Sequence, residues 1–233
     1  MKRVAILQSN YIPWKGYFDI VNRVDEFVLY DDVQYTRNDW RNRNRIKTAT
    51  GLQWLTIPVR LENSRPRIRD VQAVDDSWRR RHWRALERNY GRAPCFRACA
   101  ERFEALYAGG SETPLSQINR RFIEAVNDLL GIRTRLRWSW EFEVSGSRTE
   151  RLVGICRQLG AGEYLSGPAA RDYIEPERFA EAGIRLTWMS YEGYPEYPQL
   201  HGAFEHAVSV LDLIFNMGTE GPRYMLSFGG AGA

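Results

Sequence analysis

The chain has 233 residues, with 33 Lys and Arg against 29 Asp and Glu and a net charge of +4. This length allows a substantial core in one or two domains, and the ordinary hydrophobic content excludes a disordered chain. The net positive charge favours an anionic partner such as a phosphorylated ligand, whereas the interleaving of basic and acidic residues disfavours a nucleic acid. No apolar run has membrane-spanning length and no secretory leader pattern is present, so we expect a cytoplasmic protein without membrane contact.

Strand and helix patterns alternate at both ends of the chain, which predicts an α/β fold with a mostly parallel sheet and flanking helices. Strands are expected at 4–7, 27–30, 53–59, 135–140, 163–166 and 184–190. Helices are expected at 76–90, 96–107, 114–130, 147–160 and 209–217. We interpret residues 1–233 as a single α/β domain with a helix-rich insertion at about 76–131. Residues 67–74 are a candidate partner strand for 53–59, and the Gly-Ala tail at 229–233 is expected to be loose.

The stretch from Val4 to Pro58 contains most of the polar and aromatic residues that point to a site. Its first strand runs into a loop from Gln8 to Tyr17, and a strand-loop-helix unit presents backbone N–H groups to an anion. Lys15 is available to contact a phosphate. An ordinary structural turn between strand and helix is the alternative.

Two carboxylates, Asp31 and Asp32, end the second strand of this stretch. Either could bind a sugar hydroxyl or accept a proton, and the alternative is a cap or an ion pair with a nearby Arg. Adjacent strand residues point to opposite faces, so the two side chains are not expected to meet one ligand atom. The segment from Arg41 to Arg45 follows, with planar donors for carboxylate or phosphate, and Trp40 and Tyr35 offer stacking faces. A solvated charged loop is the alternative for this segment.

His82 follows Trp78 by one turn of a predicted helix and is the first choice for acid–base chemistry at neutral pH, with a structural histidine as the alternative. His201 and His206 flank a later segment around Phe204. Cys95, Cys99 and Cys156 form no CxxC pair, so we predict buried thiols and no metal site. No Walker loop, dinucleotide glycine fingerprint or nucleophile elbow occurs, so these classes are disfavoured, and the sequence does not identify a cofactor.

Several separated motifs resemble the WbqC-like protein family over nearly the whole chain. They are Gln8-x-x-Tyr11-x-Pro13-Trp14-x-Gly16-Tyr17-Phe18, Tyr30-Asp31-Asp32-Val33-Gln34, Arg41-Asn42-Arg43-Asn44-Arg45-Ile46, Trp54-Leu55-Thr56-x-Pro58, Trp78 with His82, Tyr164-Leu165-Ser166-Gly167, the Pro195–Gln199 loop and Ser209–Gly218. The chain departs from the family pattern at Ser9, where the family typically has Pro, and at Tyr194, where a His often stands.

The resemblance implies a role in small-molecule biosynthesis, in surface-polysaccharide (O-antigen) or secondary-metabolite pathways. We therefore expect a transferase that moves an acyl or aminoacyl group onto the amine of an amino-sugar nucleotide or related amino metabolite. An ATP-dependent ligase or nucleotidyl-transfer enzyme and a non-catalytic ligand-binding partner of biosynthetic enzymes stay open, as does a homo-oligomer. The catalytic candidates are His82, Asp32 and Asp31. The substrate-binding candidates are Gln8, Tyr11, Trp14, Lys15, Tyr17, Tyr35, Arg41, Asn42, Arg43, Asn44, Ser166 and Gln199.

Overall fold

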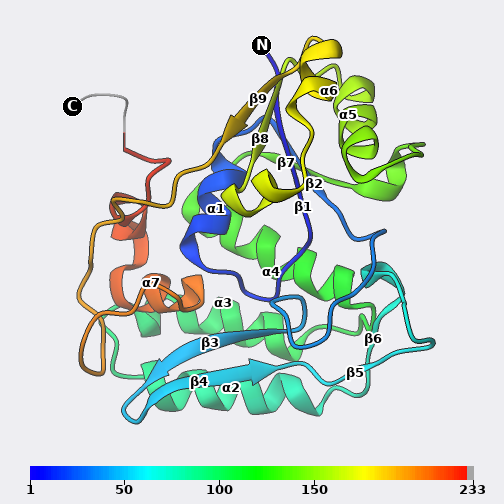
Figure 1. Cartoon of the computed structure of the whole chain (residues 1–233). Helices are drawn as coiled ribbons and strands as arrows, with labels where there is room; N and C mark the ends of the chain where they lie inside the picture. The colour runs from blue at the N-terminus through cyan, green and yellow to red at the C-terminus, as the bar shows by residue number, and fades with distance from the viewer. Residues whose placement is uncertain (230–233) are drawn as a thin grey trace.

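Short strands that are buried on both faces form the centre of the protein, as expected for a parallel sheet covered by helices. The computed structural model describes residues 1–229, and within them five parallel strands lie in the order β7-β2-β1-β8-β9 (Figure 1). These strands are β1 (Arg3–Leu7), β2 (Glu26–Leu29), β7 (Arg135–Trp138), β8 (Glu163–Ser166) and β9 (Arg185–Trp188). The α/β fold class and the mostly parallel sheet are thereby confirmed.

Helices cover both faces of this sheet. Successive residues of β1 point to opposite faces, so each face contributes its own apolar side chains. Val4 and Ile6 pack with helices α5 (Arg148–Gln158) and α6 (Pro176–Glu181), whereas Ala5 belongs to the larger apolar cluster on the other face. That larger cluster includes α1 (Lys15–Asn22) and α4 (Leu115–Leu130). Helix α5 begins at the capping box predicted from the sequence, in which Ser147 accepts a hydrogen bond from the Glu150 amide.

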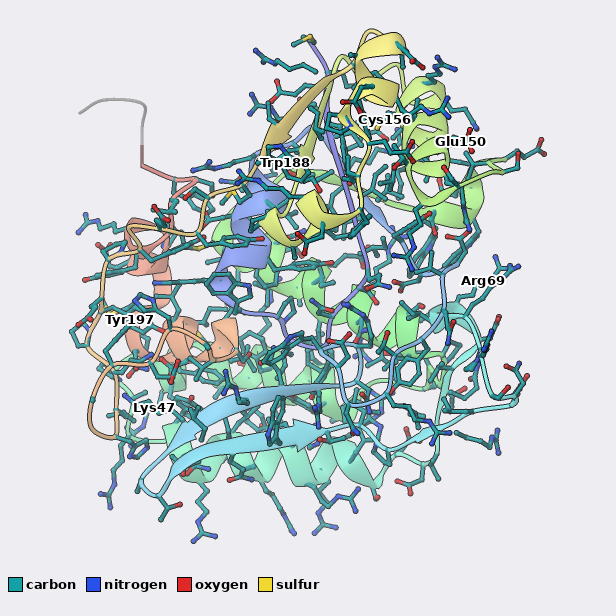
Figure 2. All side chains as sticks on the ribbon, viewed as in Figure 1. Lys47, Arg69, Glu150, Cys156, Trp188 and Tyr197 are labelled. Atoms are coloured by element: carbon teal, nitrogen blue, oxygen red, sulfur yellow. The ribbon has the colours of Figure 1, made fainter. Side chains whose placement is uncertain are left out.

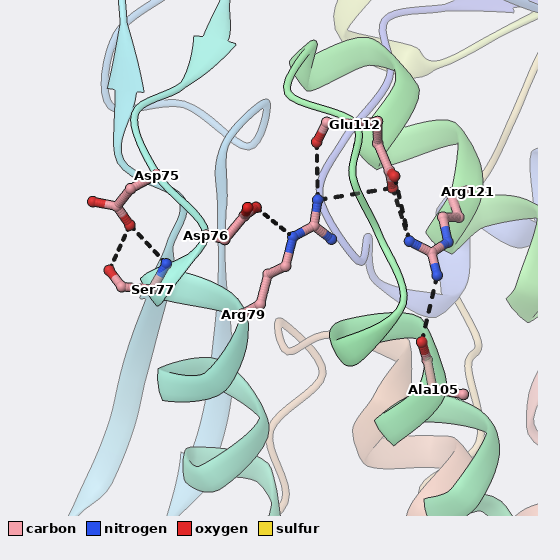
Figure 3. Close-up of polar contacts among 7 residues, drawn as sticks. All are labelled: Asp75, Asp76, Ser77, Arg79, Ala105, Glu112 and Arg121. Atoms are coloured by element: carbon pink, nitrogen blue, oxygen red, sulfur yellow. Dashed lines mark hydrogen bonds and ion pairs between the residues drawn. The ribbon is translucent and has the colours of Figure 1, made fainter.

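The helix-rich middle of the chain is confirmed as three consecutive helices: α2 (Ser77–Tyr90), α3 (Phe96–Ala108) and α4. Their apolar faces join the larger cluster together with the last helix, α7 (Val210–Met217). At one end of this layer, Arg79 donates to Asp76 and to the carbonyl of Glu112, whose carboxylate also accepts from Arg121 (Figure 3). This buried guanidinium connects the start of α2 to the segment that leads into α4.

The second half of the Arg41–Arg45 segment lies in a strand, and Arg41 and Asn42 precede that strand. β3 (Arg43–Thr48) pairs antiparallel with β4 (Gly51–Thr56), and Arg45 lies opposite Trp54. The pairing of 67–74 with 53–59 is realised only as the short ladder of β5 (Val59–Arg60) and β6 (Gln72–Ala73). Local charge and amide content suggested a loop for 41–45, but pairing with β4 decides the conformation. This hairpin covers α2 on one side of the molecule (Figure 1).

The C-terminal segment packs back against the first helix. Gly218–Tyr224 form a 3-10 helix after α7, and the amides of Leu226 and Ser227 donate to the buried carboxylate of Asp19 on α1. The expectation of a loose tail at 229–233 falls for the most part outside the described residues. None of the helices among residues 1–229 is both long and apolar enough to span a membrane.

Candidate functional site

β1 lies between β2 and β8, so the later strands are added on both sides of it. The loop after β1 therefore leaves the sheet at the point where the strand order reverses. This point is the usual position of a ligand site in open α/β sheets. Backbone hydrogen bonds connect this loop to two distant segments. The amide of Tyr11 donates to the carbonyl of Trp40, and the amide of Val210 donates to the carbonyl of Pro13, at 3.0 and 2.9 Å. The amide of Ser209 donates to the carbonyl of Arg45 at 2.9 Å. Three parts of the chain therefore meet here.

A pocket of about 250 Å³ opens where these segments meet. It is lined by Asn10, Pro13, Trp14, Trp40, Asn44, His206 and Ala207. Two indole rings provide stacking area, while two amides and an imidazole provide hydrogen-bonding groups. This combination of a mostly apolar wall with a few polar groups is typical of small-molecule sites.

Asn44 holds the first loop in an unusual backbone conformation. Its Nδ2 donates to the carbonyls of Tyr11 and Ile12, at 3.1 and 2.8 Å. Ile12 has φ of 38°, which a β-branched side chain rarely adopts. Strained backbone of this kind persists where surrounding contacts determine it, and it gathers at ligand sites. The predicted ligand-binding Asn44 thus both lines the pocket and shapes its floor.

Asp31 lies behind the first loop, fully buried. Its carboxylate accepts from the Ser9 amide at 2.8 Å and the Ser9 hydroxyl at 2.6 Å, and that hydroxyl accepts from Asn119 of α4 at 2.9 Å. Burial raises the pKa of Asp31, although the bonds from Ser9 and the charge of Arg41 oppose the rise. The departure from the family pattern has a local role here, because a proline at position 9 could supply neither the amide nor the hydroxyl.

Arg41 connects this buried carboxylate region to the pocket wall. One of its terminal nitrogens donates to the side chain of Asn10, which lines the pocket, and another lies 3.5 Å from Asp39. Burial lowers the pKa of Arg41. The guanidinium still remains charged at neutral pH, because an arginine in a protein is not deprotonated. A positive charge therefore stands directly behind Asn10.

Asp31 and Asp32 lie in the turn after β2, and their side chains have different partners. It forms an ion pair with Arg151 of α5 and accepts from the hydroxyl of Ser139 after β7. Neither aspartate lines the pocket. The interpretation of Asp32 as the partner of a neighbouring Arg matches this geometry.

His82 is buried inside the helical layer, and both ring nitrogens have partners. Its Nε2 lies 3.2 Å from the carbonyl of Thr56, which can only accept, so Nε2 carries the proton. Its Nδ1 then accepts from the Tyr11 hydroxyl at 2.9 Å, and that hydroxyl accepts from Tyr107 at 2.8 Å. Burial lowers the pKa of His82 to about 4. Neither His82 nor Tyr11 lines the pocket, and the catalytic role of His82 stays a prediction.

Lys15 lies beneath the pocket among aromatic rings and is almost fully buried. Its Nζ is 4.8 Å from the Tyr194 ring centroid and 5.1 Å from that of Tyr197, and it donates to the carbonyl of Pro195 at 3.2 Å. Burial lowers the pKa of Lys15 to about 8. Tyr194, the second departure from the family pattern, donates to the buried carboxylate of Asp19. The lysine thus contributes positive charge beneath the pocket and does not line it.

His206 is the exposed histidine of the pocket wall. Its ring lies 4.6 Å from the ring of Phe204, and burial together with the charge of Lys15 lowers its pKa. The imidazole is therefore neutral at pH 7 and able to accept a proton.

Gln199 holds the segment that carries His206. Its Oε1 accepts from Lys47 and from the amide of Glu205, both at 2.9 Å, and its Nε2 donates to the Glu205 carbonyl at 3.0 Å. Lys47 on the hairpin and Tyr197 after β9 lie on the same side of the molecule (Figure 2). The predicted ligand-binding Gln199 is thus engaged with protein groups and positions the pocket wall.

Asp212 of α7 holds the segment that precedes this helix and carries His206. It is fully buried and accepts from the hydroxyls of Tyr90 and Tyr197, each at 2.8 Å. Burial raises the pKa of this carboxyl. The aromatic segment before α7 is therefore fixed by a buried polar network.

The remaining substrate-binding candidates do not line the pocket. Gln8 accepts a bond from the Tyr17 hydroxyl through its carbonyl, and Asn42 donates to the Ile57 carbonyl. Tyr35 and Ser166 are buried, and Ser166 closes the end of β8. Of the substrate-binding candidates, the structure brings Trp14 and Asn44 into one pocket, with Arg41 directly behind it.

Several pocket residues escaped the sequence interpretation. Asn10 lies among the loop residues predicted to bind a ligand, so the same reasoning could have included it. His206 and Ala207 lie nearly two hundred positions further along the chain, and no local pattern connects them to the first loop.

A larger, open groove of about 530 Å³ lies elsewhere, over α4 and β7. Its lining includes Arg120, Glu124, Arg137 and Glu141. These side chains neutralise one another, because Arg120 pairs with Glu124 and Arg137 with Glu141. Among residues 1–229, no three His, Cys, Asp or Glu side chains gather in a way that could hold a metal ion.

The parallel sheet, the mid-chain helices and the pocket at the β1 loop define an α/β protein with a pocket of mixed aromatic and polar character. The model of the WbqC-like protein family matches residues 8–224, and the chain belongs to this family. A relative from Mycobacterium tuberculosis (strain ATCC 25618 / H37Rv), named uncharacterized protein Rv1507c, is 51% identical over 226 residues. The match covers 97% of this chain and 98% of that relative. No solved structure matches the chain significantly.

Proposed function

We propose that this protein is a biosynthetic transferase that moves an acyl or aminoacyl group onto the amine of an amino-sugar nucleotide or a related small amino metabolite. One observation carries the proposal. A neutral imidazole, His206, lines the pocket at the β1 loop together with two indole rings and two side-chain amides. The pathway class, surface polysaccharide or secondary metabolite, comes from the family resemblance.

The pocket groups suit an amino sugar. The apolar face of a sugar ring stacks on Trp14 or Trp40, and the amides of Asn10 and Asn44 supply donors and acceptors for hydroxyl groups. The positive charges of Arg41 and Lys15 behind the wall favour an anionic substrate. The same charges disfavour an ammonium group, so the substrate amine is bound more readily in its neutral, nucleophilic form.

The reaction follows from these groups. The neutral amine attacks the carbonyl carbon of an activated acyl donor, such as a thioester, and a C–N bond forms. His206 accepts the proton that the amine loses, and the bond from the carbonyl carbon to the leaving group of the donor breaks. Among the candidate bases we favour His206, because it lines the pocket, whereas His82, Asp31 and Asp32 do not.

The test is a turnover screen followed by mass spectrometry. The natural chain is incubated with amino-sugar nucleotides together with acyl thioesters, or with free amino acids, ATP and Mg²⁺. We expect a mass increase equal to one acyl group on the amine. His206→Gln should lower kcat by about 10²- to 10⁴-fold, the usual contribution of a general base.

The matched control is His201→Gln, which alters the other histidine of the same segment outside the pocket. It should keep most of the turnover. Product formation that requires ATP would assign the chain to the ligase class instead. Binding of an amino-sugar nucleotide without any product would leave only a ligand-binding role and would contradict the proposed reaction.

A further inference from the structure

Four side chains form an exposed surface beside the pocket: Trp40, Arg43, Arg45 and Trp54, here termed the Trp–Arg platform. The two indole rings lie 5.4 Å apart between centroids, and 39% of Trp40 and 42% of Trp54 is exposed. The Arg43 guanidinium carbon lies 4.2 Å from the Trp54 ring centroid, and that of Arg45 lies 5.6 Å from both rings. Large aromatic faces are thus open to solvent beside two cations.

The two arginines of the platform have no acidic partner within the described residues. Among the ion pairs within residues 1–229, none involves Arg43 or Arg45. The Nε atoms of both are buried without a hydrogen-bond partner in this part of the chain. One terminal nitrogen of Arg43 donates to the carbonyl of Asn38. The remaining terminal N–H groups of the two arginines form no hydrogen bond or ion pair within the described residues, and planar guanidinium groups bind phosphate well.

The platform is continuous with the pocket through Trp40, which belongs to both. Sites that enclose a drug-sized ligand measure roughly 300 to 1,000 Å³. The pocket, at about 250 Å³, is below that range. A nucleotide sugar therefore cannot fit within it entirely. The part of such a ligand that extends past Trp40 would lie over Arg43, Arg45 and Trp54.

We propose that the Trp–Arg platform binds the nucleoside diphosphate portion of the substrate, with the base stacked on an indole and the phosphates on Arg43 and Arg45. This inference deepens the proposed function and rests on it for the assignment of the sugar to the pocket. A base offers a flat π-face to Trp and a diphosphate offers paired oxygens to guanidinium. The platform comprises four side chains and adjoins the acidic Asp39, which suits one nucleotide better than a polynucleotide.

The experiment measures the binding of UDP, GDP, CDP and dTDP to the full-length chain by calorimetry, without any acyl donor. At least one diphosphate should bind, and the matching nucleoside should bind much more weakly. Trp54→Ala should weaken the binding roughly five- to 150-fold, the range for loss of one stacking partner. Arg45→Gln should weaken it about tenfold. Arg84→Gln, which removes an exposed charge on α2, is the matched control and should leave binding unchanged.

The outcomes separate the two proposals. If no nucleoside diphosphate binds, or if Trp54→Ala and Arg45→Gln both bind as the natural chain does, the platform inference is wrong even where turnover is found. If both substitutions weaken diphosphate binding but no acyl donor gives product, the platform stands and the transferase proposal fails. Tighter binding of tRNA that competes with the diphosphates and weakens steeply with salt would overturn the inference in favour of a polynucleotide. Circular dichroism confirms that each variant is folded.

Discussion

Replacement of His82 by Gln should remove a large part of the acid sensitivity of this protein. The neutral imidazole donates to the Thr56 carbonyl and accepts from the Tyr11 hydroxyl inside the helical layer. A proton added to Nδ1 would place a buried positive charge there and break the bond from Tyr11. The folded state therefore resists protonation of His82, whereas the unfolded chain does not.

The magnitude follows from linkage between protonation and folding. Burial lowers the pKa of His82 to about 4, against an ordinary value of about 6.5 in the unfolded chain. The folded pKa lies below the unfolded one, so the contribution to stability is complete above pH 6.5 and is lost as the pH falls towards 4. At about 1.4 kcal/mol for each pH unit, the loss over this interval is about 3 kcal/mol.

The assay is urea unfolding of the natural chain and His82→Gln at several pH values from 7.5 to 4.5. Other groups titrate in both chains, so the difference between the two free-energy curves isolates His82. Between pH 7 and 4.5 the natural chain should lose about 2.5 kcal/mol more than the variant. His206→Gln, at an exposed histidine, is the matched control and should follow the natural chain to within about 0.5 kcal/mol.

Parallel curves for the natural chain and His82→Gln would refute this reasoning. They would mean that the imidazole has the same proton affinity in the folded and unfolded states, and hence that it is open to water. An NMR titration in which the His82 ring protonates near pH 6.5 would lead to the same conclusion and would revive its candidacy as an acid–base group.

Three further outcomes are expected. Gly16→Ala would press a methyl group into the Trp14 ring, so binding of an amino-sugar nucleotide should weaken while the circular dichroism spectrum is kept. Asp212→Ala should lower stability by about 3 kcal/mol because it leaves buried tyrosine hydroxyls without an acceptor, and Tm should fall by roughly 6 to 12 °C. The exposed control Asp128→Ala should cost less than about 1 kcal/mol. Because burial and a nearby cation lower the pKa of His206, kcat should stay level from pH 8 to 6.5 and fall only in more acidic buffer.

Much of the fold could be predicted because its signals are local. The period of apolar residues places the long helix at 115–130, and the serine and glutamate of the capping box start helix α5 at residue 148. The segment 41–45 was harder, because its conformation depends on pairing with a strand whose residues lie beyond the turn.

The site was only partly predictable for a related reason. Trp14 and Asn44 lie within the stretch that the polar pattern singles out, so their participation could be inferred. His206 lies at the pocket because backbone hydrogen bonds join Pro13 to Val210 and Arg45 to Ser209. These contacts connect distant positions in the sequence, so a periodic pattern of residues cannot predict them. The environment of His82 likewise depends on the tertiary contact with Tyr11. The sequence predicts a helical histidine, but it does not show that the imidazole is buried and neutral.

The most direct test of the proposed site is a crystal structure of the protein with an amino-sugar nucleotide bound. The account predicts the amino sugar between Trp14 and Trp40, with its amine within hydrogen-bonding distance of His206. The diphosphate should lie over Arg43 and Arg45. A ligand bound instead in the groove over α4 and β7, with the pocket at the β1 loop empty, would contradict it.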